Sequence, residues 1–176
     1  MHCKDYAIQP EKKHNHSPMK KVLFICHGNI CRSPMAEYVF RDMVAKDGLT
    51  EKIGTASAAT SNEEIGNPIY PPVRELLNSH GIKCDGKRAR RIVASDYEEY
   101  DYLVAMDRNN LRNMRPVFWE DPKGKITLLL DHTDSTNTAF HGRDVLDPWY
   151  TRDFEATWQD IQTGCRSLLE EIKKTL

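Results

Sequence analysis

The first residues that could do chemistry are a cysteine and an arginine separated by five residues, Cys26 and Arg32. Four apolar residues, 22–25, precede the cysteine, and Ser33-Pro34 follows the arginine. A thiolate is a strong nucleophile, and the planar guanidinium fork of arginine matches two oxygens of a tetrahedral oxyanion. The spacing therefore predicts a nucleophilic thiol at the base of an anion-binding loop.

Both ends of this loop have a secondary-structure signal. Residues 22–25 are typical of a strand that is covered on both faces. Ser33 is expected to cap a helix, and Pro34 suits its first turn. A loop between a strand and a helix points backbone N–H groups into one concavity at the positive end of the helix dipole. Such a place binds an oxyanion and favours the thiolate form of Cys26.

The residues around the cysteine are expected to complete the anion site. Gly28 lets the backbone approach an anion closely, and Asn29 tolerates a left-handed backbone while it braces the loop. Ser33 can donate a hydrogen bond to the thiolate. The predicted phosphate-binding loop comprises His27, Gly28, Asn29, Ile30, Cys31 and Ser33.

A second candidate for chemistry lies near the end of the chain. A thiolate that attacks phosphorus must expel an alkoxide or phenoxide, so it needs an acid nearby. Asp147, in the segment Val145-Leu-Asp-Pro-Trp-Tyr150, is the best candidate because it follows a long polar connection and stands beside aromatic residues. By itself, an Asp-Pro pair is more typical of an ordinary turn.

The rest of the chain alternates predicted strands with predicted helices. This order is typical of an α/β fold with a parallel sheet covered on both sides, in which ligands bind beyond the carboxyl ends of the strands. The predicted strands are 22–25, 53–59, 102–106 and 126–130. The predicted helices are 33–47, 73–80, a short one with a capping box at Ser95 and Glu98, 108–114, and 154–172.

Length and composition limit the possible classes of protein. The 176 residues, 39% of them hydrophobic, are enough for one domain, which we place at 20–176. Residues 1–19 are polar, and we expect a disordered N-terminal extension or residues added for expression. A net charge of -1 gives no case for nucleic acid or membrane partners. Five cysteines without metal-ligand spacing favour a reducing, cytoplasmic location.

These motifs together resemble those of one family. Cys26-x5-Arg32-Ser33 near the start, with Asp147-Pro148 near the end, is similar to the low-molecular-weight protein tyrosine phosphatases. The similarity runs from about Lys21 to the C-terminus. It includes Ser57-Ala-Ala-Thr60, Asn67-Pro68, His80-Gly-Ile82, Tyr102 to Asp107, Asn110-Leu-Arg112 and Phe154-Glu155. The resemblance implies a three-layer domain with a four-stranded parallel sheet, no metal or cofactor, and hydrolysis of protein phosphotyrosine and small aryl phosphates.

The resemblance also implies roles in a two-step reaction. Cys26 attacks the phosphoryl group and forms a phosphocysteine, while Arg32 and the loop amides hold the equatorial oxygens. Asp147 protonates the leaving phenol and then deprotonates the water that hydrolyses the intermediate. Ser33 stabilises the departing thiolate.

Three further residues match supporting positions of the family. Asn29 and Ser57 correspond to residues that keep the loop in shape. Cys31 is near enough in sequence to form a protective disulfide with Cys26 under oxidation, and a packed loop thiol is an equal alternative.

The chain also departs from the family pattern around the predicted cleft. Many relatives carry an aromatic residue where this chain has Glu63, and the usual Tyr-Tyr after Asp-Pro is here Trp149-Tyr150. One wall of the cleft is therefore expected to be acidic and to disfavour acidic substrates. Lys87 replaces a histidine of some relatives, and no role is assigned to it. Asp107 matches a family aspartate at a strand end, where a structural role is favoured over that of a second acid.

Three alternative functions remain. Arsenate reductases of this fold need two further cysteines, close in sequence, to relay a disulfide. This chain has only Cys84 in that region, so the relay is missing. Protein arginine phosphatases of this fold carry threonine at the position of Ile30, and an apolar Ile30 favours tyrosine. The third alternative is an anion-binding or interaction domain that has lost turnover. The presence of Cys26, Arg32 and Asp147 argues against it.

Overall fold

Strand β1 (Lys20–Cys26) is the centre of the sheet. It pairs in parallel with β2 (Ile53–Ala59) on one side and with β3 (Tyr102–Ala105) on the other. Strand β4 (Ile126–Leu128) extends the sheet beyond β3. The computed structural model describes residues 18–176, and within them the strand order is β2-β1-β3-β4, all parallel. The predicted four-stranded parallel sheet is confirmed.

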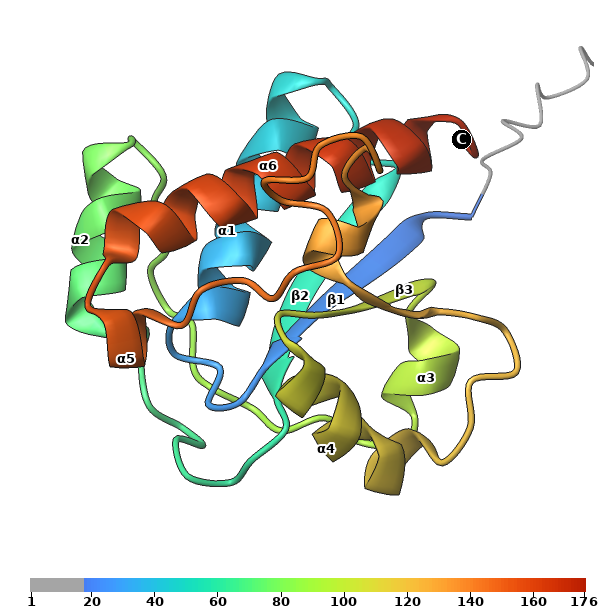
Figure 1. Ribbon diagram of the computed structural model, residues 1–176, viewed down its shortest axis with the longest axis horizontal. Helices are drawn as coiled ribbons and strands as arrows, with labels where there is room; N and C mark the ends of the chain where they lie inside the picture. The colour runs from blue at the N-terminus through green and yellow to red at the C-terminus, as the bar shows by residue number, and fades with distance from the viewer. Residues whose placement is uncertain (1–17) are drawn as a thin grey trace, which may run out of the picture.

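Helices cover both faces of this sheet, which gives three layers (Figure 1). One face packs against α1 (Arg32–Lys46), α2 (Pro71–Ser79) and α6 (Phe154–Lys173). The other face packs against α3 (Asp96–Glu99) and α4 (Arg108–Phe118).

The buried side chains of β1 alternate between these two cores. Val22 and Phe24 belong to the first apolar cluster, and Leu23 and Ile25 belong to the second. A strand must be apolar at successive positions when both of its faces are covered, which explains the run of apolar residues in the sequence.

The fourth strand is shorter than predicted. The chain leaves the sheet after Leu128 and forms a 3-10 turn, η1 (Leu129–His132), beneath α6. A Cβ atom at Gly164 of α6 would lie 2.5 Å from Cγ of Leu129, so the glycine is what lets the helix approach this turn closely. Leu129 and Leu130 are fully buried, and the apolar run therefore fills the space under a helix rather than continuing the strand.

Two predicted helix caps are wrong. Helix α1 begins at Arg32, so Ser33 lies inside its first turn, and its hydroxyl contacts the Cys26 thiol. Ser95 makes no side-chain cap hydrogen bond, and the backbone N–H of Val93 is bound by the Asp96 carboxylate at 2.9 Å.

A capping box does occur at the start of α4. Oδ1 of Asp107 accepts a hydrogen bond from the Asn110 backbone N–H at 2.7 Å. The Asn110 side chain accepts one in return from the Asp107 backbone N–H at 3.2 Å. Asp107 therefore has a structural role, as predicted, and α4 extends to Phe118, beyond the predicted end at Met114.

Other helix predictions agree with the structure. Gly48 follows the end of α1 with a φ of 68°, a left-handed conformation that favours glycine. The closing helix α6 matches the predicted helix 154–172 and buries one apolar face, and a short helix, α5 (Pro148–Thr151), precedes it. Over residues 18–176, the structure contains no helix with the length and apolar character needed to cross a membrane. The predicted N-terminal extension falls almost wholly outside the described residues.

The chain topology brings the candidate site together at one edge of the sheet. Cys26 ends β1, and Asp107 follows β3. The long connection after η1 returns to the same edge, where the Val145 N–H donates to the Met106 carbonyl at 2.9 Å. Asp147 thus arrives beside the loop that begins at Cys26.

Candidate active site

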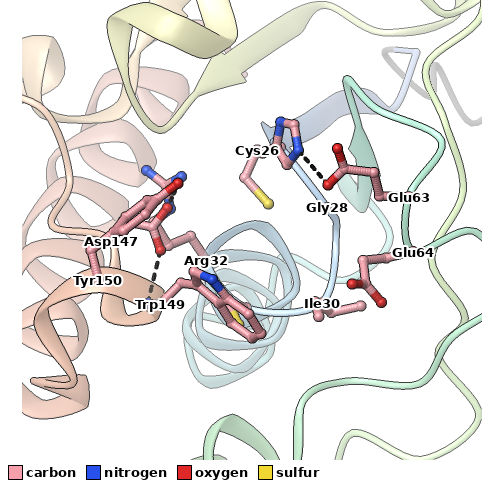
Figure 2. Close-up of a pocket in the computed structure, with 11 residues that line it drawn as sticks. Cys26, Gly28, Ile30, Arg32, Glu63, Glu64, Asp147, Trp149 and Tyr150 are labelled. Atoms are coloured by element: carbon pink, nitrogen blue, oxygen red, sulfur yellow. Dashed lines mark hydrogen bonds and ion pairs between the residues drawn. The ribbon is translucent and has the colours of Figure 1, made fainter.

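A cavity of ≈ 190 Å³ opens at this edge of the sheet (Figure 2). Its base is the loop that follows β1, and its walls come from the segments that follow β2 and that contain Asp147. The lining residues are Cys26, His27, Gly28, Ile30, Cys31, Arg32, Glu63, Glu64, Asp147, Trp149 and Tyr150.

The thiol of Cys26 lies almost buried among polar groups. Its Sγ accepts a hydrogen bond from the Asn29 backbone N–H at 3.3 Å and lies 3.0 Å from Oγ of Ser33. Asn29 has a φ of 58°, the left-handed conformation that its residue type was expected to tolerate. The sharp turn at Asn29 aims the backbone N–H at the sulfur, where donors stabilise a thiolate.

A buried hydrogen-bond network supports the loop from behind. Nδ2 of Asn29 donates to Oγ of Ser33 at 2.9 Å and to Oγ of Ser57 at 2.8 Å. Oδ1 of Asn29 accepts from the Arg90 backbone N–H at 3.1 Å. The structure therefore brings Asn29, Ser33 and Ser57 together, in positions that suit the roles predicted for them.

Two residues to which the sequence assigned no role continue this network. Glu37, on α1, is 4% exposed and accepts a hydrogen bond from Ser57 Oγ at 2.6 Å. Lys87 forms an ion pair with Glu37 at 2.9 Å. A signal was available for Glu37, since it stands four residues after Ser33 and therefore on the same face of the helix.

The Arg32 guanidinium is buried between two carboxylates. Its Nη1 donates to Asp107 Oδ2 at 2.6 Å, and its Nη2 lies 2.7 Å from Asp147 Oδ2. Burial disfavours the charge, but the surrounding Cys26, Asp147 and Asp107 outweigh it and raise the pKa of Arg32 above its usual value. Arg32 is therefore a fixed positive charge beside the thiol.

The segment that carries Asp147 is anchored by the closing helix. Asp160 on α6 is 2% exposed, and it pairs with Arg143 and accepts a hydrogen bond from the Leu146 N–H at 3.0 Å. The Thr157 hydroxyl donates to the Leu146 carbonyl at 2.9 Å. Asp147 itself caps α5, because its Oδ1 accepts from the Trp149 N–H at 3.0 Å. Neither Asp160 nor Thr157 was predicted from the sequence.

One wall of the cavity is acidic (Figure 2). Glu63 is exposed and pairs with Nε2 of His27 at 2.9 Å. Glu64 lies over the loop, where its Cγ would be 3.2 Å from a Cβ added at Gly28. Glu64 was not predicted as a cleft residue. The expected acidic wall is thus present, with two carboxylates instead of one.

The opposite wall is aromatic. Trp149 packs edge-on against Tyr70, with ring centroids 5.8 Å apart, and Tyr70 stacks on Phe154 at 6.2 Å. Tyr150 is 83% exposed at the rim of the cavity. Flat side chains at such a rim suit contact with an aromatic substrate group.

The second cysteine of the loop differs from the first in its surroundings. Burial, with a smaller contribution from the charges of Cys26 and Asp147, raises the pKa of Cys31 to about 12. Cys31 therefore remains a protonated thiol at neutral pH, and Cys26 is the candidate nucleophile. Within residues 18–176, no group of three His, Cys, Asp or Glu side chains is arranged to hold a metal ion.

A thiol held by amide and hydroxyl donors, with an arginine and a carboxylate beside it, defines a site of the cysteine-dependent phosphatase class. Residues 21–176 match the family described as low molecular weight phosphotyrosine protein phosphatase. The chain belongs to this family, and it is a hydrolase that acts as a cysteine-based protein tyrosine phosphatase.

Individual relatives cover nearly the whole domain. The low molecular weight protein-tyrosine-phosphatase YfkJ of Bacillus subtilis is 44% identical over 156 residues, which are 89% of this chain and 97% of YfkJ. The YfkJ crystal structure superposes with a TM-score of 0.84 over 90% of this chain and 98% of that one. A protein tyrosine phosphatase from Entamoeba histolytica, crystallised with Hepes in the active site, is 30% identical, with a TM-score of 0.80 over 89% and 98% of the two chains.

Proposed function

We propose that Cys26, Arg32 and Asp147 carry the phosphatase reaction, with protein phosphotyrosine and small aryl phosphates as substrates. The observation that supports this most directly is the position of the three groups. The thiol is surrounded by donors, and the guanidinium is paired with Asp147 at 2.7 Å in the same cavity.

In the first step, the Cys26 thiolate attacks phosphorus in line with the tyrosyl oxygen. The sulfur–phosphorus bond forms as the bond from phosphorus to the phenol oxygen breaks, and Asp147 gives its proton to that oxygen. Arg32 and the loop amides hold the three equatorial oxygens, where negative charge is concentrated in the transition state. The products of this step are a tyrosine side chain and a phosphocysteine.

In the second step, water attacks the phosphocysteine. The Asp147 carboxylate takes a proton from the water, a phosphorus–oxygen bond forms, and the sulfur–phosphorus bond breaks. The departing thiolate is stabilised by the Asn29 N–H and by the Ser33 hydroxyl, which lie 3.3 Å and 3.0 Å from the sulfur. Inorganic phosphate leaves, and the enzyme is restored.

The chemistry of the cavity favours phosphotyrosine over phosphoarginine. The side chain of Ile30 lines the cavity and offers no hydroxyl to a guanidinium. We expect turnover of phosphotyrosyl peptides and p-nitrophenyl phosphate, and no turnover of phosphoarginyl peptides. Steady-state phosphate release on matched peptides measures this. Acid quenching followed by mass spectrometry is expected to find one phosphoryl group on the peptide that contains Cys26. Equal rates on both peptides, or a phosphoryl group elsewhere, would contradict the proposal.

The acidic wall predicts a preference among peptide substrates. Glu63 and Glu64 stand beside the cavity, so peptides with basic residues near phosphotyrosine are expected to react faster than acidic ones. Replacing Glu63 by Gln removes one of the two charges. We expect the ratio of kcat/KM for a basic over an acidic peptide to fall by about threefold, the effect of one partly screened charge.

A matched control for this prediction is Glu51→Gln, an exposed carboxylate that does not line the cavity. It changes the net charge equally and is expected to leave the ratio unchanged. An unchanged ratio in Glu63→Gln as well would show that the wall does not select substrates.

The state of the cysteines supports a reducing location. Among residues 18–176, Cys26, Cys31, Cys84 and Cys165 are all free and buried. The proposed nucleophile works only as a reduced thiol, so we propose that the protein acts in the cytoplasm.

A further inference from the structure

The hydrogen bonds behind the phosphate-binding loop form a chain that runs from Lys87 to the nucleophile. Lys87 contacts Glu37 at 2.9 Å, Glu37 contacts Ser57 at 2.6 Å, and Ser57 contacts Asn29 at 2.8 Å. Asn29 then contacts Ser33 at 2.9 Å, and Ser33 contacts the thiol of Cys26 at 3.0 Å. Apart from Lys87, which is partly buried, the members of this chain are nearly fully buried.

The direction of the first half of this chain follows from the charge on Glu37. An ionised carboxylate only accepts hydrogen bonds, so the Ser57 hydroxyl must donate to Oε2 of Glu37. A hydroxyl has one proton, and Ser57 can therefore only accept from the Asn29 amide.

The direction of the second half follows from the Asn29 amide. Its oxygen accepts from the Arg90 backbone N–H, so its NH₂ group must face both serines and donate to each. The proton of Ser33 is then free to donate. It has two acceptors, the Cys26 sulfur at 3.0 Å and the Ala58 carbonyl at 3.5 Å, and a charged sulfur at the shorter distance is the better one.

Lys87 is the less exposed of two cations that contact the Glu37 carboxylate. Its side chain is 13% exposed, and it also donates to the Ser57 carbonyl at 3.0 Å. The other cation beside Glu37, Arg41, is 47% exposed and contacts the other carboxylate oxygen, Oε1. Without Lys87, Oε2 of this buried carboxylate loses its ion-pair partner, and the carboxylate is no longer held against Ser57. A Ser57 hydroxyl that is free to turn no longer fixes the order of the chain.

We propose that Lys87 is a positioning residue, which holds Glu37 as an ionised acceptor and so fixes the Ser33 hydroxyl as a donor to the Cys26 thiolate. This inference rests on the proposed function of Cys26 as the nucleophile. It assigns a role in the reaction to a side chain that does not line the cavity.

The test replaces Lys87 by Met, which keeps the length of the side chain and removes its charge. The first readout is the rate of alkylation of Cys26 by iodoacetamide as a function of pH, with the labelled peptide identified by mass spectrometry. We expect the midpoint of this profile to rise by roughly half a pH unit to one pH unit, because the hydrogen bond from the Ser33 hydroxyl to the Cys26 thiolate is weakened. The second readout is p-nitrophenyl phosphate hydrolysis, in which kcat falls by about three- to tenfold while KM changes little.

Lys83→Met is the matched control, since Lys83 is an exposed lysine on the same connection. It is expected to leave both readouts unchanged. Lys87→Arg keeps the charge and is expected to restore part of kcat. Glu37→Leu removes the acceptor of the Ser57 hydroxyl, so it should reproduce the shift, and adding Lys87→Met to it should produce little further change.

An alkylation profile and kcat in Lys87→Met that equal those of the Lys83 control would overturn the proposal, even if the melting temperature fell. If Lys87→Met does not fold, an unchanged profile in Glu37→Leu overturns it instead. A shifted profile combined with phosphatase activity that survives Cys26→Ser would refute the proposed mechanism and leave the positioning of the thiol standing.

Discussion

We expect Cys26→Ser to abolish turnover: kcat/KM for p-nitrophenyl phosphate should fall by roughly 10⁴-fold or more, because the proposed covalent intermediate cannot form. A serine hydroxyl is not ionised at neutral pH and needs a base to become a nucleophile. The histidine among the lining residues, His27, is paired with Glu63. Arg32 and the loop amides are unchanged in this variant. We therefore expect inorganic phosphate to raise its melting temperature as much as that of the wild type.

Cys31→Ser is the control for this prediction. Cys31 lies in the same loop, and burial keeps its thiol protonated, with a pKa of about 12. Its replacement is expected to change kcat by no more than a few-fold. Substantial activity in Cys26→Ser, or an equal loss in Cys31→Ser, would show that the nucleophile has been misassigned.

We expect Asp147→Asn to slow the reaction in a way that depends on the leaving group. Asparagine keeps an oxygen that can cap α5 through the Trp149 N–H, but it has no acidic proton to give. For phenyl phosphate, a poor leaving group, kcat is expected to fall by about 10²- to 10³-fold, within the range for loss of a general acid. For p-nitrophenyl phosphate, whose phenolate leaves without help, the loss is expected to be much smaller. Rates across a series of substituted phenyl phosphates measure this dependence.

Asp107→Asn provides the matched comparison. Asp107 pairs with the same guanidinium at 2.6 Å, but it also caps α4 and does not line the cavity. Its replacement should disturb Arg32 and lower activity to a similar extent for every leaving group. If the leaving-group dependence changed in Asp107→Asn and not in Asp147→Asn, the acid would be Asp107.

The local features of the loop could be predicted because short-range sequence determines them. Residues 22–25 are apolar at every position because both faces of β1 are covered. Asn29 adopts the left-handed backbone expected of its residue type. The cap at Ser33 was predicted wrongly because its hydroxyl had a second possible partner, the thiol of Cys26, which the linear sequence does not show.

The ion pairs that neutralise the buried carboxylates could not be predicted in this way. Charged residue types such as Glu37 and Asp160 are most often exposed. Each is buried because a cation from a distant segment, Lys87 or Arg143, neutralises it. Such ion pairs depend on tertiary contacts between segments far apart in the sequence. The early end of β4 has the same kind of cause, because Leu129 packs beneath Gly164 instead of extending the strand.

The anchoring of the Asp147 segment to α6 has a consequence for how the enzyme becomes active during folding. The loop of Cys26 is synthesised early, but Asp147, the proposed acid, is positioned only after Asp160 and Thr157, near the C-terminus, have docked. The central strand β1 likewise has both of its neighbours in the sheet only after β3 has paired with it. Such non-local contacts form late and cooperatively. Catalytic activity should therefore return in a refolding experiment only with the docking of α6, and a nascent chain that lacks this helix should be catalytically silent.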